Sequence, residues 1–162
     1  MTIKLGIDKK GEKVEFDLEE NNNICIVGNV KSDKVELAKK IMEQFEGSSI
    51  WFKPGDEFNV NNEDGLVVIE DVDNLEESKT LKEIIDHPTK TIIITTEFDE
   101  ETIPDNIIKN IDIFFIGYIR SVANYPTQRL KLTKSTMYLD NGEFIVSREN
   151  QKERKINIED IG

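Results

Sequence analysis

The chain has 162 residues, of which 37% are hydrophobic and 33% charged, a balance that fits one globular domain over 1–162 and excludes a fibrous protein. Acidic residues outnumber basic ones by 33 to 21, and the net charge of −12 disfavours nucleic acid as a partner. The single Cys25 and single His87 exclude an internal disulfide and a metal site rich in Cys and His within this chain.

No apolar run approaches the roughly 20 residues that cross a bilayer, and the first residues lack the apolar stretch of a signal peptide. We therefore expect a cytoplasmic domain that makes no membrane contact itself. Such a domain is also compatible with the cytosolic end of a membrane-anchored protein.

The first elements are expected to be strands. Residues 3–7 and 14–18 alternate apolar with polar side chains and predict an N-terminal β-hairpin with its turn at 9–11. The run 24–27 is continuously apolar and ends at Gly28, which is typical of a buried parallel strand.

A helix is expected after this strand, because apolar residues recur at helical spacing from Val35 to Phe45. Asp33 and Glu36 have the spacing of a capping box, and Gly47 is expected to end the helix.

The middle of the chain alternates strands with helices. Apolar runs predict strands over 50–53, 66–69, 91–95 and 113–116, with helices over about 75–87 and 104–110 between them. This order predicts a three-layer α/β fold with a mostly parallel sheet. At the C-terminal end, residues 137–139 and 144–146 around Asp140-Asn141-Gly142 predict a second β-hairpin.

The loop after the strand 24–27 has the frame of the phosphate-binding motif G-x-x-x-x-G-K-[ST]. It reads Gly28, Asn29, Val30, Lys31, Ser32, Asp33, Lys34 and Val35. Gly28 and Lys34 match, but Asp33 replaces the second glycine and Val35 replaces the hydroxyl residue that binds Mg²⁺. A carboxylate 4 Å from a phosphate costs about 4 kcal/mol at an effective dielectric near 20. A left-handed non-glycine residue costs about 1–2 kcal/mol more.

The apolar run 66–69 leads into Glu70 and Asp71, which have the position of a Walker B pair in reversed order. These two carboxylates are the candidate catalytic residues. With Val35 in place of a hydroxyl, we predict that the chain holds neither a metal ion nor ATP as a working cofactor.

The order of these parts resembles the RecA-like motor domain of FtsK/SpoIIIE-type translocases, carried by LGID, FDLEENNN, ICIVGNVKSDK, LVVIEDVDNLEE, TIIITTEFDEETIPDNIIKNID and FFIGYI. It is most similar to the degenerate C-terminal ATPase domain of EssC-type coupling proteins of type VII secretion. The resemblance implies a P-loop-NTPase fold and a role in protein transport. It also implies that Thr96 and Glu97 take the sensor position, and that Asp112 lies where the family carries an arginine.

We therefore expect a degenerate ATPase domain that acts as an interaction or regulatory module. Its expected partner is a protein, either an adjacent ATPase domain or a secreted substrate. The alternatives are a weak but active ATP-binding motor that uses Lys34, Glu70 and Asp71, and an acidic DNA mimic.

An acidic rim is the expected partner surface, because carboxylates follow the carboxyl ends of neighbouring strands and would favour a basic segment. The rim comprises Glu70, Asp71, Asp73, Glu97, Asp99, Glu100 and Glu101. The other interpretation is that these acids only keep the domain soluble.

Overall fold

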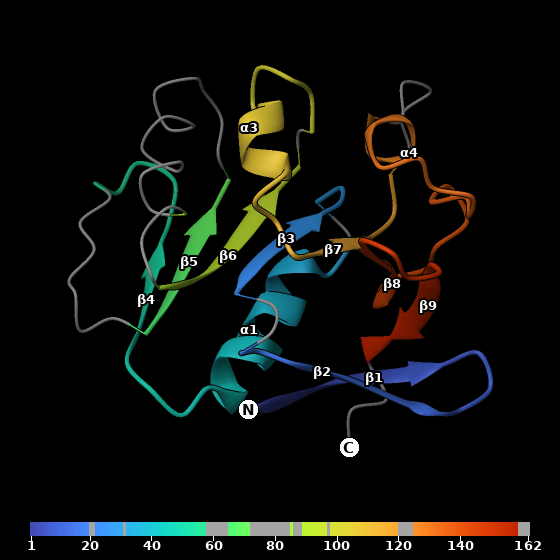
Figure 1. Cartoon of the computed structure of the whole chain (residues 1–162), viewed down its shortest axis with the longest axis horizontal. Helices are drawn as coiled ribbons and strands as arrows, with labels where there is room; N and C mark the ends of the chain where they lie inside the picture. Colours follow the sequence, from blue (N-terminus) through green and yellow to red (C-terminus); the bar gives the residue numbers. More distant parts are fainter. Residues whose placement is uncertain are drawn as a thin grey trace.

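The computed structural model describes residues 1–19, 22–30, 32–57, 65–71, 85, 89–96, 98–119 and 125–158. Within them, nine strands form one mixed sheet in the order β2-β1-β9-β8-β7-β3-β6-β5-β4 (Figure 1). The three-layer α/β fold expected from the sequence is confirmed.

One half of the sheet is parallel. It consists of β3 (Asn23–Val27), β4 (Ser49–Phe52), β5 (Leu66–Glu70), β6 (Lys90–Thr95) and β7 (Ile113–Ile116). Central strand β3 pairs in parallel with β6 on one side and with β7 on the other. Because all five strands run in the same direction, the loops at their carboxyl ends lie along one edge.

The sheet is covered on both faces, which explains why its strands are continuously apolar. Ile24 and Ile26 of β3 pack in one cluster with Leu37 and Ile41 of α1 (Lys34–Gln44). The alternate residues of β3 belong to a second cluster on the other face, with Ile107 of α3 (Asp105–Ile108).

The other half of the sheet is antiparallel and joins the two ends of the chain. It contains β1 (Thr2–Asp8), β2 (Lys13–Asp17), β8 (Glu143–Arg148) and β9 (Arg154–Asn157). The expected N-terminal hairpin is confirmed as β1–β2, and β1 also pairs with β9. Gly6 has φ 150°, and a Cβ atom there would overlap the carbonyl of Asn157, so only glycine fits this junction.

The ends of α1 differ from the expectation. The carboxylate of Asp33 makes no capping hydrogen bond, so the predicted capping box is wrong. The helix ends at Gln44 rather than at Gly47. The Gln44 amide exchanges hydrogen bonds of 2.8 and 2.9 Å with the backbone of Lys4, so contact with β1 fixes the end of the helix.

The C-terminal hairpin forms from different strands than predicted. Residues 137–139 are not a strand, and β8 pairs instead with β7 and β9. Met137 and Tyr138 are both exposed, so this segment has no alternating face to place in a sheet.

The helix expected over 75–87 lies outside the described residues except for Ile85, which is buried. The short α4 (Tyr125–Arg129) follows β7 along the chain. In the described part of the chain, no helix combines the length and the apolar character needed to cross a membrane.

Candidate functional site

The candidate site lies where the loop after β3 and the end of β5 meet the carboxyl end of β6. The Gly28 N–H donates to the Thr95 carbonyl at 3.2 Å, and the Asp71 N–H donates to the Ile94 carbonyl at 2.8 Å. The fold therefore brings the predicted loop residues and the predicted carboxylates to one edge of the sheet.

Three hydrogen bonds within the loop converge on one carbonyl. The Asn29 carbonyl accepts from the Ser32 N–H at 3.0 Å, from the Ser32 hydroxyl at 2.6 Å and from Lys34 Nζ at 3.3 Å. The Asn29 N–H donates to the Tyr118 carbonyl at 2.9 Å. The N–H groups of Gly28, Asn29 and Ser32 thus all point at protein carbonyls rather than toward a site for an anion.

Ser32 fills the inside of the loop. Its side chain is fully buried, and a Cβ atom added to Gly28 would overlap its hydroxyl. Val30 is 85% exposed at the tip of the same loop. The loop therefore closes over a serine side chain and presents an apolar residue outward.

Asp33 has the left-handed backbone that its motif position requires, with φ 62° and ψ 26°. This is the conformation that glycine adopts freely, and for an aspartate it carries strain. The sequence comparison that placed Asp33 at the second glycine of the motif agrees with this geometry.

Lys34 carries a buried positive charge. The residue is only 6% exposed, and burial lowers the pKa of its ammonium group below the ordinary 10.5. The negative charges of Asp71 and Glu70 act in the opposite direction and favour the protonated form. Lys34 and the two carboxylates therefore form one electrostatic group at the carboxyl edge.

Glu70 is held by a side chain from the neighbouring strand. The indole N–H of Trp51 on β4 donates to Glu70 Oε2 at 2.8 Å. Asp71, the next residue, has a left-handed φ of 54°. Of the acidic pair, Glu70 thus has a fixed indole partner, whereas Asp71 has a strained backbone.

The residues present do not fit a magnesium–nucleotide complex. Val35 offers no oxygen to a cation, and the Lys34 ammonium group already donates to the Asn29 carbonyl. In the described ranges, no group of three His, Cys, Asp or Glu residues is arranged to hold a metal ion.

The remaining motif positions are only partly described. Thr96 follows β6 and is half-buried, whereas Lys31, Asp73 and Glu97 lie outside the described residues. Asp112 accepts a hydrogen bond from the Asn23 N–H at 3.0 Å, at the amino end of β3. It therefore supports the start of the central strand, at the sheet edge opposite to the loop.

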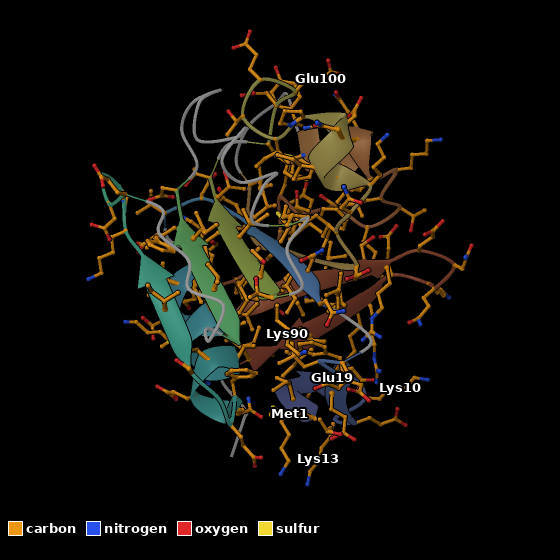
Figure 2. All side chains as sticks on the ribbon, turned by 60° about the vertical axis from the view of Figure 1, so that its left-hand side comes forward. Met1, Lys10, Lys13, Glu19, Lys90 and Glu100 are labelled. Carbon is orange, nitrogen blue, oxygen red and sulfur yellow. The ribbon has the colours of Figure 1, made fainter. Side chains whose placement is uncertain are left out.

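The turn after β6 carries two of the expected rim residues on its surface. Glu100 and Glu101 are exposed, and Figure 2 shows Glu100 at the opposite end of the molecule from Met1, Lys10 and Lys13. Asp99 instead accepts a hydrogen bond from the Thr102 N–H at 2.8 Å, so its carboxylate stabilises the turn.

Arg129 holds this turn from α4. One guanidinium nitrogen donates to the carbonyls of Phe98 and Asp99 at 2.9 Å each, and the other pairs with Asp105 at 2.8 Å. The guanidinium group also lies 5.1 Å from the centre of the Phe98 ring.

A mostly apolar hollow of about 470 Å³ borders Glu70 on the side of α1. Val35, Met42, Trp51 and Pro54 form part of its lining. The rest of the lining is charged, with two lysines beside Glu70.

The sequence reasoning missed Trp51 and Arg129 as parts of this region, and it named Ser32 only as one position of the loop. Trp51 lies in the predicted strand 50–53, and its hydrogen-bond partner Glu70 is 19 residues further along the chain. Only the chemistry of tryptophan could have indicated this contact, because a partly buried indole N–H needs a hydrogen-bond acceptor. The pairing of β4 with β5 brings Glu70 close enough to be that acceptor.

Comparison with family models found no match, and no curated protein matches the sequence. Many solved structures share the fold, and three of them represent the range. ATPases 2 and 3 of Thermomonospora curvata EccC, in complex with a signal sequence peptide, match with a TM-score of 0.63 and 12% identity over 97% of this chain and 40% of that one. The cytoplasmic domain of EssC matches with a TM-score of 0.61 and 14% identity over 97% of this chain and 42% of that one. The genome packaging NTPase B204 of Sulfolobus turreted icosahedral virus 2 matches with a TM-score of 0.62 and 14% identity over 85% of this chain and 98% of that one.

The class of fold is therefore the RecA-like α/β fold of P-loop ATPases. Within that class, the chain has the fold of an FtsK/SpoIIIE-type ATPase domain and is similar to EssC and EccC, as the sequence motifs indicated. It spans about two fifths of the length of those EccC and EssC chains.

Proposed function

We propose that this chain is an ATPase-like domain of a secretion machine that has lost nucleotide turnover and acts through protein contacts. The observation that carries the proposal is the closed loop, in which the Asn29 carbonyl accepts three hydrogen bonds, one of them from the Lys34 ammonium group. A nucleotide would have to break these contacts and approach the Asp33 carboxylate, with no hydroxyl at position 35 to help hold Mg²⁺.

The test compares thermal unfolding with and without MgATP. A ligand at 1,000 times its Kd stabilises a protein by about 4 kcal/mol. For a chain of this length that corresponds to a rise in Tm of about 8–16 °C. We expect no such shift for the wild type, and no phosphate release above background.

A restored loop serves as the matched control. Asp33→Gly/Val35→Thr removes the carboxylate and supplies a hydroxyl, so this variant should gain an MgATP-dependent rise in Tm. Adding Lys34→Ala to it should abolish that rise. A MgATP response of the wild type that disappears in Lys34→Ala would instead establish the alternative, a weak active motor that uses Lys34, Glu70 and Asp71.

The partner surface is proposed at the exposed Glu100 and Glu101, and the partner is an adjacent ATPase domain or a secreted substrate with a basic segment. The EccC structure in complex with a signal sequence peptide supports a peptide as one kind of partner. The attraction of these acids for a basic partner segment should weaken as the salt concentration rises.

The rim is tested with a labelled peptide in which lysines alternate with leucines. Glu100→Lys/Glu101→Lys should weaken its binding severalfold at low salt, whereas Glu15→Lys/Glu43→Lys, which changes the charge equally at two other exposed glutamates, should not. Asp99 is left intact because its carboxylate stabilises the turn. If both variants lose the same affinity for the peptide, the acidic rim serves only to keep the domain soluble.

A further inference from the structure

A second surface lies on the antiparallel half of the sheet. It consists of Lys9, Lys134, Met137 and Tyr138, and we call it the lysine–tyrosine platform. In Figure 1 the segment that carries its last three residues runs from α4 to β8. It does not include any residue of the closed loop or of the acidic rim.

The platform exposes two large apolar residues in succession. Tyr138 is 83% exposed and Met137 50%, although Thr136 before them and Leu139 after them are buried. Tyrosine and methionine are enriched at protein interfaces, and aromatic side chains are prominent among the residues that dominate binding energy.

The turn beneath these residues is firmly anchored. The Glu153 carboxylate accepts hydrogen bonds from the Thr133 N–H at 2.6 Å and from the Lys134 N–H at 3.0 Å. The Ile119 N–H donates to the Thr136 carbonyl at 3.4 Å. A fixed turn presents Met137 and Tyr138 in one arrangement, which reduces the entropy lost when a partner binds.

A hollow of about 270 Å³ adjoins Tyr138, with Leu139 and Ile145 among its apolar lining residues. Lys9, Lys134 and Lys155 also line it. Lys155 is paired with Glu143 at 2.7 Å, whereas Lys9 and Lys134 form no ion pair with any part of the chain that the structure describes. Two lysines without an ion pair in the described ranges thus flank a hollow whose lining is part polar and part apolar.

We propose that the lysine–tyrosine platform binds an acidic segment of a partner protein. Carboxylates of the segment pair with Lys9 and Lys134, and an apolar side chain between them enters the hollow beside Tyr138. Nucleic acid fits less well, because it offers no aliphatic side chain to Leu139 and Ile145 in the hollow. The proposal does not depend on whether the closed loop binds nucleotide.

The experiment uses fluorescence anisotropy with a labelled peptide in which glutamates alternate with leucines. Reference probes are the same peptide with glutamine for glutamate, and a single-stranded DNA. The folded wild type should bind the acidic peptide saturably at low salt, less tightly at high salt, and more tightly than either reference probe.

Two platform variants should weaken binding for different reasons. Lys9→Glu/Lys134→Glu should lower affinity about tenfold because two attractions become repulsions. Met137→Ser/Tyr138→Ser should lower it about thirtyfold because the apolar anchors are lost. The control Lys53→Glu/Lys109→Glu makes the same charge change at exposed lysines elsewhere and should stay within twofold.

Three results would overturn the proposal: no saturable binding to the wild type, equal loss in the control and platform variants, or equal affinity for the glutamine peptide. Preferential binding of the DNA would assign the platform to nucleic acid instead. Thermal unfolding of each variant shows that it is folded. Because all four platform side chains project from turns, these substitutions should leave the core intact.

Discussion

Replacing the buried Lys34 with methionine should make the protein more stable. Lys34 is 6% exposed, and burial lowers the pKa of its ammonium group, which means that the folded structure disfavours the charge relative to water. Methionine has a similar length and no charge. The Asn29 carbonyl would keep two hydrogen bonds from Ser32, so no acceptor is left unsatisfied.

The expected gain at pH 7 is about 1–2 kcal/mol, at the low end of what replacing buried charges with apolar residues yields. The gain in stability is limited because Glu70 and Asp71 lose the nearby positive charge of Lys34. Both are only partly buried, and Glu70 retains the indole hydrogen bond from Trp51. For a chain of this size the gain corresponds to a rise in Tm of about 2–8 °C.

The pH dependence gives the prediction a second measurement. The folded-state pKa of Lys34 lies below its unfolded value of 10.5, so between the two the unfolded chain binds more protons and wild-type stability rises with pH. Lys34→Met lacks this contribution. The difference in free energy of unfolding between Lys34→Met and the wild type should therefore shrink as the pH rises toward 10.5.

Urea unfolding followed by the fluorescence of the single Trp51 and by circular dichroism measures the effect. Lys39→Met is the control, because Lys39 is 52% exposed and pairs with Glu36 at only 3.7 Å, so its loss should change stability by less than about 0.5 kcal/mol. A loss of 1 kcal/mol or more in Lys34→Met would refute the reasoning and make Lys34 an essential counter-ion of the two carboxylates.

Four further results are expected. Gly6→Ala should lower stability by about 2 kcal/mol or more in urea unfolding, because its Cβ would strike the backbone of β9. Arg129→Lys should lower it by about 2 kcal/mol, since lysine cannot reproduce the paired carbonyl contacts. The hydrogen bond from Arg154 lowers the pKa of Asp8. The stability that this pair contributes is therefore present above the ordinary pKa of 3.8 and is lost as the pH falls below it. Arg154→Gln should make the free energy of unfolding depend less on pH in this acid range. No shift of labelled duplex DNA is expected at micromolar protein and about 150 mM salt.

Much of the parallel half of the sheet was predictable because its information is local. Each of its strands is a short apolar run with a turn signal at its end, as in Ile24–Val27 before Gly28. Parallel strands need crossover connections, and these place the following loops along one edge. The meeting of the loop 28–34 with Glu70 follows from that order alone.

The antiparallel half was less predictable because its pairing depends on distant partners. Residues 144–146 read as a strand, but their neighbours β7 and β9 could not be inferred from a local turn signal. The Asp140-Asn141-Gly142 sequence suggested a hairpin with 137–139, yet exposure of Met137 and Tyr138 leaves that segment outside the sheet.

The closed loop is stabilised by contacts within the protein that need no nucleotide. In an ATPase that binds its ligand, the ligand stabilises the folded state by an amount that grows with its concentration, and an empty loop must leave its N–H groups to water. Here the N–H groups of Gly28 and Asn29 are satisfied by the carbonyls of Thr95 and Tyr118, and Ser32 occupies the interior. These contacts stabilise the folded loop, and under the proposed function ATP could reach it only after the hydrogen bonds to the Asn29 carbonyl were lost.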